Sequence, residues 1–396
     1  MSVGYGFTSV DTIELPDIAK GLYIPDDCSL AFHLGFKNRV FWYAINCRED
    51  MYHVYAIPKR RGGKRLIHAP NPMMKTLLRQ AHYKILVPIQ EELGEHVTAY
   101  RKGHSTKDAV SQHIPKCEVC DAMEKGKTAK NHKCPRRGTY INMDLQDFFP
   151  NTRRSWIRNY FKEAGYSHFV AGLIAQLLTV NMPNPRYGTK FERPEERKNL
   201  SGVPQGSPAS GAICNIVADW KLDKNILAYM EELNQRHNLT DPEWRWKYTR
   251  YSDDLAFTCG KNLPKKAKED IAKKLVQICN QSGYRVNKRK TRITNTFYRK
   301  QLLGIVFNVH PNVTKDEYLS LRALIHNCLV QGFDTQYRRA GKESEGELIT
   351  WLTGKVNYIQ QINPDRGARL AHELKVALKV KEEDDTNEQN PDAKTG

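Results

Sequence analysis

The sequence contains no run of about 18 consecutive apolar residues, the length that a transmembrane helix requires. Residues 1–6 lack the charged and apolar regions that begin a secretory signal peptide. Nine cysteines among 396 residues, without such a signal, are typical of thiols or metal ligands and argue against a disulfide framework. No internal repeat and no amphipathic membrane anchor are visible. We therefore expect a cytoplasmic protein without a membrane partner.

Acidic residues are scarce relative to basic ones. The chain has 44 Asp and Glu against 62 Lys and Arg, which gives a net charge of +18. Such an excess predicts a phosphate-rich partner whose affinity falls steeply as salt rises. The hydrophobic content of 40% supports a globular core, and the length suits two or three domains.

Two adjacent carboxylates, Asp253 and Asp254, lie between two β-prone runs in residues 247–258. This pattern predicts a β-hairpin with both carboxylates at its tip. Neighbouring like charges repel and resist desolvation, so a fold that keeps them together needs a compensating cation, and magnesium is the usual one. Taken alone, the dipeptide is more typical of an ordinary solvated turn.

A second strand is predicted upstream, at residues 139–149. Ile141, Met143 and Leu145 share one face by the period of two, and Asn142 and Asp144 share the other. A carboxylate from each strand can flank a pair of metal ions about 4 Å apart, which is the arrangement that clamps the two oxygens of an in-line phosphoryl transfer.

A glycine-containing loop, Ser-Gly-Val-Pro-Gln-Gly-Ser-Pro at residues 201–208, lies between the two strands and is expected to open a helix, with Pro208 in its first turn. The order Asp-containing strand, Val-Pro-Gln-Gly-Ser-Pro loop and Tyr-x-Asp-Asp hairpin resembles the palm of reverse transcriptases. This resemblance covers roughly residues 50 to 375.

The resemblance implies an α+β right-hand polymerase fold with fingers, palm and a helical thumb. The expected domains are an N-terminal helical segment at 1–50, fingers at 51–138, palm at 139–310 with a fingers insertion around 150–200, thumb at 311–380 and a disordered tail at 381–396.

The resemblance also implies a two-metal polymerase site. Two magnesium ions would be held by the carboxylates of Asp144, Asp253 and Asp254 and by the backbone carbonyl of Leu145. A primer hydroxyl would attack the α-phosphorus of a dNTP there. Lys290, in an Asn-x-x-Lys-Thr element, would approach the triphosphate and act as a general acid on pyrophosphate.

Six residues are expected to contact the substrate by the same resemblance: Lys59, Arg65, Phe149, Gln205, Gly206 and Tyr251. Lys59 and Arg65 would bind the triphosphate, since a planar guanidinium suits bidentate phosphate recognition. Gln205 and Gly206 would lie against the nascent base pair. Phe149 would obstruct a 2′-hydroxyl and select dNTP over rNTP, unless it is a core aromatic residue.

An insertion in the expected fingers carries four metal-binding residue types, at Cys117, Cys120, His132 and Cys134. Between them the segment is hydrophilic and has little core of its own. Four such ligands could hold a tetrahedral structural zinc ion. The His-x-Cys half is tighter than usual finger spacing, so free thiols remain the alternative.

The resemblance is greatest to retron and retron-like, defence-associated bacterial enzymes. It implies a dedicated structured noncoding RNA that serves as template, either alone or also as primer, together with a DNA product, an effector protein and a role in antiphage defence. Two elements depart from retrons proper: Asp-Ala-Val-Ser-Gln-His at 108–113 is one residue longer, and Leu-Leu-Gly replaces Val-Thr-Gly at 302–304. The alternatives are a template-independent or protein-primed polymerase of the abortive-infection type, and a catalytically idle RNA-binding scaffold.

Overall fold

A four-stranded antiparallel sheet lies at the centre of the computed structural model, which describes residues 24–59, 63–122, 132–182, 200–294 and 299–389. Its strand order is β6 (Lys247–Tyr251), β7 (Asp254–Cys259), β3 (Thr139–Asp144) and β8 (Arg292–Thr294). The predicted hairpin is therefore β6–β7, and the predicted Asp-containing strand is β3. Ile141, Met143 and Leu145 are all buried, as the period of two predicted.

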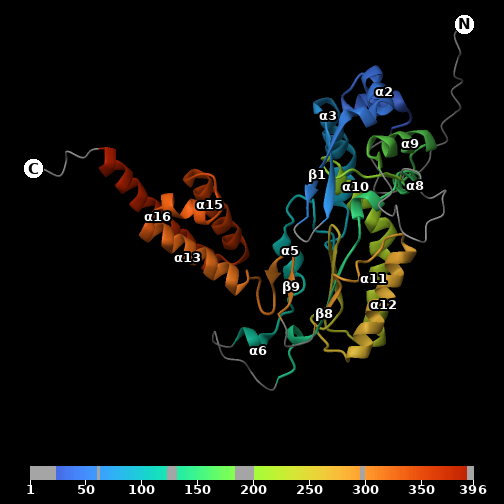
Figure 1. Cartoon of the computed structure of the whole chain (residues 1–396). Helices are drawn as coiled ribbons and strands as arrows, with labels where there is room; N and C mark the ends of the chain where they lie inside the picture. The colour runs from blue at the N-terminus through green and yellow to red at the C-terminus, as the bar shows by residue number, and fades with distance from the viewer. Residues whose placement is uncertain (1–23, 60–62, 123–131, 183–199, 295–298, 390–396) are drawn as a thin grey trace, which may run out of the picture.

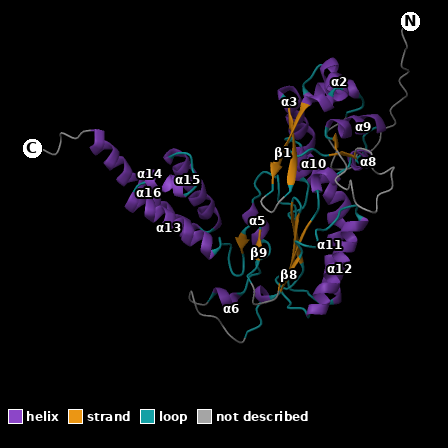
Figure 2. Ribbon diagram, in the orientation of Figure 1, coloured by secondary structure: helices purple, strands orange, loops and turns teal. Residues whose placement is uncertain are grey.

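Helices cover one side of this sheet (Figures 1 and 2). They are α10 (Ser210–Ala218), the π-helical segment η6 (Asp219–Asp223), α11 (Lys224–Arg236) and α12 (Lys265–Gln281). Their apolar residues join one large core with the sheet and the fingers. Pro208 lies in a turn before α10, which begins at Ser210, so the expectation that Pro208 forms part of the first helical turn is wrong.

The fingers contain a two-stranded hairpin and several short helices. The hairpin is β1 (Tyr52–Pro58) with β2 (Lys64–Pro70). The helical elements before β3 are α1 (Asp27–Leu34), α2 (Asn38–Asn46), η2 (Arg48–Met51), α3 (Pro72–Ala81), η3 (His82–Leu86), α4 (Val87–Glu91), α5 (Thr106–Ser111), α6 (Glu118–Asp121) and η4 (Pro135–Arg137).

The helical stretch over residues 72–91 is interrupted at its middle. The segment η3 has π-helical bonding, and Pro88 follows it. Because proline has no N–H, Pro88 cannot bond the carbonyl of Lys84. The His33 ring nitrogen Nε2 lies 3.5 Å from that carbonyl oxygen, while Lys84 Nζ donates to the carbonyl of His33 at 2.7 Å. These contacts join α1 to the interrupted helix.

The segment between β3 and α10 contacts the N-terminal helices through α9. It comprises α7 (Phe148–Asn151), α8 (Arg154–Glu163), α9 (His168–Leu177), β4 (Val180–Met182) and β5 (Leu200–Gly202). Helices α8 and α9 contribute Ile157, Phe161, Val170 and Ile174 to the large core.

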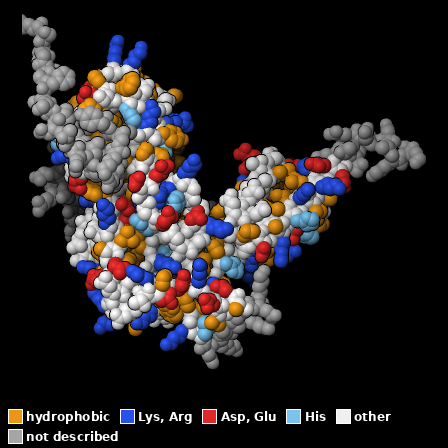
Figure 3. Space-filling model, turned by 180° about the vertical axis from the view of Figure 1, so that it is seen from behind, with side chains coloured by type: hydrophobic (Ala, Val, Ile, Leu, Met, Phe, Trp, Pro, Cys, Tyr) orange, Lys and Arg blue, Asp and Glu red, His pale blue; other side chains and the backbone are white. Residues whose placement is uncertain are grey.

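Four helices form the thumb: α13 (Lys315–Gln331), α14 (Phe333–Arg339), α15 (Glu345–Ile362) and α16 (Pro364–Gln389). They share a second core with the hairpin β9 (Gln301–Leu302)–β10 (Ile305–Val306). The thumb helices stand apart from the fingers, and the surface is hollowed between them (Figures 1 and 3).

Helix α16 runs on to Gln389, past residue 381 where the sequence predicted a disordered tail to begin. Two ion pairs support this stretch: Lys379 with Glu383 at 3.7 Å and Lys381 with Glu345 at 2.9 Å. Residues 390–396, the candidate helix at 15–22 and the basic fingers tip at 60–61 lie outside the described residues. None of the described helices is long and apolar enough to cross a membrane.

Candidate active site

Strand register places the predicted carboxylates at one end of the central sheet. Asp144 of β3 lies directly opposite Asp254 of β7. Ser252 and Asp253 form the two-residue turn between β6 and β7, and Ser252 has a positive φ of 58°, which the turn requires. The N–H of Leu145 donates to the carbonyl of Asp253 at 2.8 Å, so this backbone bond holds the turn against the end of β3.

The carboxylates raise one another's proton affinity. Burial, Asp253 and Asp144 together raise the pKa of Asp254 from 3.8 to about 7. Burial and Asp144 also raise the pKa of Asp253. Negative charge at this end of the sheet is therefore only partly compensated by protein groups, which is the electrostatic condition that favours a bound divalent cation.

Lys290 is the cation that the protein itself supplies. Its Nζ lies 2.6 Å from Oδ1 of Asp144. The turn that carries it is fixed by a backbone bond from the N–H of Asn287 to the carbonyl of Asp144, at 2.7 Å. Lys290, which was predicted to approach the triphosphate, thus forms an ion pair with Asp144, one of the three predicted metal ligands.

A cavity of about 790 Å³ opens in front of these groups. Nine of the predicted residues line it: Lys59, Arg65, Asp144, Leu145, Phe149, Gln205, Gly206, Asp253 and Lys290. Fingers, palm and the 201–208 loop therefore meet at one space. Asp254 and Tyr251 do not line this cavity; they pair with each other at the β6–β7 turn, and Asp254 adjoins the site through its pairing with Asp144.

The fingers hairpin is docked on the 201–208 loop. The N–H of His68 donates to the carbonyl of Gln205 at 2.8 Å. Gly206 has a φ of +121°, and an added Cβ would lie 2.8 Å from the carbonyl oxygen of His68. Glycine is required here both by the backbone conformation and by the close approach of β2.

Tyr100 is a cavity residue that the sequence did not identify. Its ring meets that of Phe149 edge to face, with centroids 6.0 Å apart, and its hydroxyl lies 3.4 Å from that of Ser252. Tyr100 therefore connects Phe149, the residue expected to obstruct a 2′-hydroxyl (the sugar gate), to the Ser252–Asp253 turn. Tyr100 has a positive φ of 57° and stands at the start of a basic loop, and no local sequence pattern indicated this role.

A fully buried ion pair supports the catalytic hairpin from behind. The guanidinium of Arg250, on β6, donates from Nε and Nη2 to Asp223 at 2.8–3.0 Å and from Nη1 to the side-chain oxygen of Asn215 at 2.8 Å. Arg250 and Asp223 are both fully buried. Nε2 of His96 lies 3.0 Å from Asp219 and 3.5 Å from Asp223. Burial opposes protonation of His96, but these carboxylates raise its pKa to about 9.

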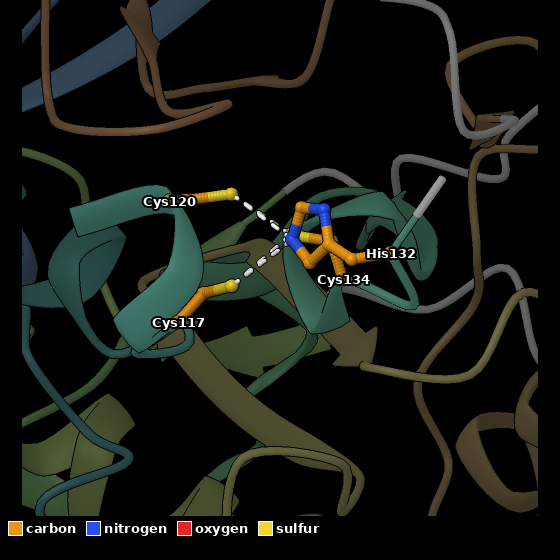
Figure 4. Close-up of side chains that lie close together, drawn as sticks. All are labelled: Cys117, Cys120, His132 and Cys134. Carbon is orange, nitrogen blue, oxygen red and sulfur yellow. Dashed lines mark hydrogen bonds between the residues drawn. The ribbon is translucent and has the colours of Figure 1, made fainter. Parts of the chain in front are cut away.

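The four residues of the predicted metal site come together in the insertion (Figure 4). The Sγ atoms of Cys117 and Cys120 each lie 3.4 Å from Nε2 of His132. The Sγ of Cys134 lies 3.5 Å from that of Cys120 and 3.7 Å from that of Cys117. Zinc bonds of about 2.3 Å to sulfur and 2.0 Å to nitrogen in a tetrahedron require ligand separations of about this size.

The four ligand atoms are also tied to the palm. Asp121 accepts a bond from the backbone N–H of Cys117 at 3.3 Å and one from Arg136 Nη2 at 2.6 Å. Lys300 Nζ donates to the carbonyl of Arg136 at 3.0 Å. Burial raises the pKa of the Cys117 thiol, but hydrogen bonds from the Cys120 backbone and His132 outweigh it and lower the pKa to about 7.

The family model for reverse transcriptase (RNA-dependent DNA polymerase) matches residues 57–322, which carry the fingers hairpin, all three carboxylates and Lys290. The chain belongs to the reverse transcriptase family. The right-hand polymerase fold predicted from the sequence is confirmed.

Curated relatives are retron reverse transcriptases. The chain is 27% identical to the retron Mx65 enzyme of Myxococcus xanthus over 82% of this chain and 64% of that protein. It is 26% identical to the retron Mx162 enzyme of the same organism over 90% of this chain and 68% of that protein. It is also 26% identical to the retron Ec86 enzyme of Escherichia coli, over 58% and 59%. The predicted resemblance to retron enzymes is confirmed, and the chain spans about two thirds of the length of these relatives.

Among solved structures, the telomerase of Candida albicans in complex with a fragment of telomeric RNA covers 82% of this chain and 63% of that one. The sequences are 12% identical and the TM-score is 0.41, which is too low to support a conclusion.

The raised pKa of Asp254 predicts a pH-dependent stability in metal-free protein. Between about pH 4 and about pH 7 the folded state keeps a proton that the unfolded state releases, so stability falls as pH rises through this window. Asp254→Asn should remove this part of the fall, as measured by the melting temperature in EDTA. The control is Asp270→Asn at an exposed position of α12, which should melt with the wild-type pH profile. Identical profiles for wild type and Asp254→Asn would contradict the carboxylate repulsion.

Proposed function

We propose that the protein is an RNA-directed DNA polymerase. The observation that carries this proposal is the cross-strand pairing of Asp144 with Asp254, beside Asp253, in front of a cavity that also holds Lys59 and Arg65. Carboxylates on one side of a cavity and cations on the other suit a nucleoside triphosphate with divalent metal. Family membership supports the same conclusion.

The carboxylate end of the sheet fits magnesium by its donor chemistry. Asp144, Asp253 and Asp254 offer hard oxygen ligands, and the carbonyl of Leu145 lies beside them. The raised pKa values of Asp253 and Asp254 reflect uncompensated negative charge. Two bound magnesium ions would activate the primer hydroxyl and stabilise the leaving pyrophosphate. Lys290, which forms an ion pair with Asp144, would donate a proton to the pyrophosphate.

The remaining cavity residues select and position the substrate. Lys59 and Arg65, on the two arms of the fingers hairpin, bind the triphosphate. Gln205 and Gly206 lie against the nascent base pair, because β2 fixes their loop at the cavity. Phe149, supported by Tyr100, opposes a 2′-hydroxyl. Tyr251, at the β6–β7 turn and outside the cavity itself, is the remaining residue assigned to substrate binding.

The similarity to retron enzymes favours a dedicated structured noncoding RNA as the template and also as the source of the primer. The basic excess of the chain and the helical thumb support a large RNA partner. By the same resemblance the DNA product acts in antiphage defence, with an effector protein. One enriched RNA species bound to protein from its native host would support this assignment, and a broad sample of cellular RNA would contradict it.

Removing two of the carboxylates tests the polymerase proposal. Asp253→Ala with Asp254→Ala should lower dNTP incorporation by roughly a thousandfold or more, because the metal contributes several kcal/mol to the transition state. RNA binding should survive. Asp270→Ala with Asp316→Ala removes two exposed aspartates and should leave incorporation unchanged. Full incorporation by the first variant would show that the active site is elsewhere.

The sugar gate can be tested by ring removal. Phe149→Ala should raise the use of rNTP relative to dNTP by about tenfold, equivalent to about 1.4 kcal/mol, because a small side chain no longer opposes the extra hydroxyl. Phe149→Tyr keeps the ring and should keep the selectivity. The measurement is the ratio of kcat/KM values for the two nucleotides, and an unchanged ratio in Phe149→Ala would remove the residue from the site.

We also propose that Cys117, Cys120, His132 and Cys134 hold one structural zinc ion. The support is the tetrahedral spacing of their ligand atoms and the soft donor set. The site would fix the insertion to the palm through Arg136 and Lys300.

Elemental analysis should find about one zinc per chain, because four-ligand sites of this type are closed. Cys117→Ser with Cys120→Ser should lose the zinc, and zinc chelation should lower the melting temperature of the wild type. Cys28→Ser with Cys47→Ser changes two cysteines outside the cluster and should keep the metal. Protein that contains no zinc, including after growth in zinc-supplemented medium, would refute the site.

A further inference from the structure

Three arginines, Arg153 at the N-cap of α8 and Arg154 and Arg158 within the helix, line a second cavity outside the candidate active site. Arg153, Arg154 and Arg158 line a space of about 400 Å³. The opposite wall comes from α9, which presents Gly172 and Gln176, and from Ser201 at β5.

None of the three guanidiniums forms an ion pair within the described residues. Each has a buried nitrogen without a hydrogen-bond partner: Nε of Arg153, Nη2 of Arg154 and Nε of Arg158. Arg154 is held in place by one bond, from Nε to the hydroxyl of Thr179 at 2.8 Å, which leaves Nη2 free.

The negative charge that the described residues bring near Arg154 is already engaged by other groups. Glu49 attracts Arg154, but its carboxylate is bound to Arg48 Nη2 at 3.0 Å and to the backbone N–H of Asn181 at 3.2 Å. Burial and the charge of Arg48 lower the pKa of Arg154 to about 10. The three side chains are partly buried, and a partly buried cation without an ion-pair partner carries a desolvation cost, so an anion that enters the cavity would relieve that cost.

The wall opposite the arginines leaves room for such an anion. Gly172 has no atom within 4 Å of the position of an added Cβ. Gly172 therefore leaves open space in the cavity, and Gln176 is the longer side chain that α9 contributes to the lining. Planar guanidiniums that converge on an open cavity are the usual arrangement for binding phosphate oxygens.

The cavity adjoins the catalytic loop. The backbone of Arg153 pairs with that of Gly202, and Ser201 lines the arginine cavity while Gln205 lines the catalytic one. Ser201 and Gln205 are four residues apart, so their backbones lie at most about 14 Å from each other. At about 3.4 Å per nucleotide along a strand, about four nucleotides cover that distance.

We propose that Arg153, Arg154 and Arg158 form a phosphate site for the single-stranded RNA template on its way to the catalytic cavity. This inference rests on the proposed polymerase function. It adds a contact that holds the template backbone before pairing, without reading sequence, as phosphate contacts do. The basic excess of the chain is consistent with such a site.

A single isosteric change tests the site. Gln176→Glu places a carboxylate in front of the arginines, where it competes with phosphate. Gln235→Glu makes the same change at an exposed position of α11 and serves as the control. Both should be compared with wild type on two template–primers, one blunt and one with a template extension of about ten nucleotides, over a range of salt.

Wild type and Gln235→Glu should bind the extended template about tenfold more tightly than the blunt one. Gln176→Glu should lose most of this preference, and its slope of log affinity against log salt should fall by about 1 to 2, since each single-strand phosphate contact contributes about 0.7. Its melting temperature should be equal to or above that of wild type, because the new carboxylate offsets the repulsion. If it does not fold, Arg158→Gln makes the same test.

Equal preference for the extended template in Gln176→Glu and wild type would overturn the site while leaving the polymerase proposal intact. Failure to incorporate dNTP on any template would overturn the polymerase proposal instead, and the binding comparison would still decide the site. Inorganic phosphate separates the two sources of the ligand. If it raises the melting temperature of wild type and not of Gln176→Glu, while the extension has no effect on affinity, the cavity binds free phosphate and the template assignment is wrong.

Discussion

Repulsion among three carboxylates is the constraint on which the rest of the site depends. Asp144, Asp253 and Asp254 are brought together by strand register, and burial raises the cost of their charge. The fold resists this repulsion from two sides. On the cavity side, Lys290 forms an ion pair with Asp144. Within the core, the buried ion pair of Arg250 with Asp223 holds β6 in position. Loss of one partner from a fully buried ion pair leaves an uncompensated charge, so this anchor is as important to the geometry as the carboxylates themselves.

The other elements are arranged around that end of the sheet by backbone contacts. The fingers hairpin reaches the site because His68 bonds to Gln205 and because Gly206 lets β2 approach closely. The thumb has a core of its own, shared with the β9–β10 hairpin. The zinc-type cluster is tied to the same hairpin region through Lys300, which precedes β9. The fingers hairpin, the thumb and the cysteine–histidine cluster are thus each held by contacts of their own around the end of the sheet.

Local patterns predicted the parts of the site that repeat at short range. The period of two gave β3 and placed Asp144, and the Cys and His spacing gave a cluster whose four ligand atoms do meet. Long-range features left no such pattern. Asp223 and Asn215 reach Arg250 from a helix 27 and 35 residues earlier, and Tyr100 reaches Phe149 from another loop. The cluster Arg153, Arg154 and Arg158 is unusual because no carboxylate of the described residues forms an ion pair with it. Residues 381–396 were predicted to be disordered from their polar composition, which gives no indication of the two ion pairs near the end of α16.

The central claim is that the protein copies an RNA template. The most direct measurement is single-nucleotide extension of a DNA primer on four RNA templates that differ only in the first unpaired base, with each dNTP supplied alone and magnesium present. The account predicts that the incorporated nucleotide is the complement of the template base in all four cases. Incorporation of the same nucleotides whatever the template base, or equally without any template, would contradict it and favour a template-independent polymerase.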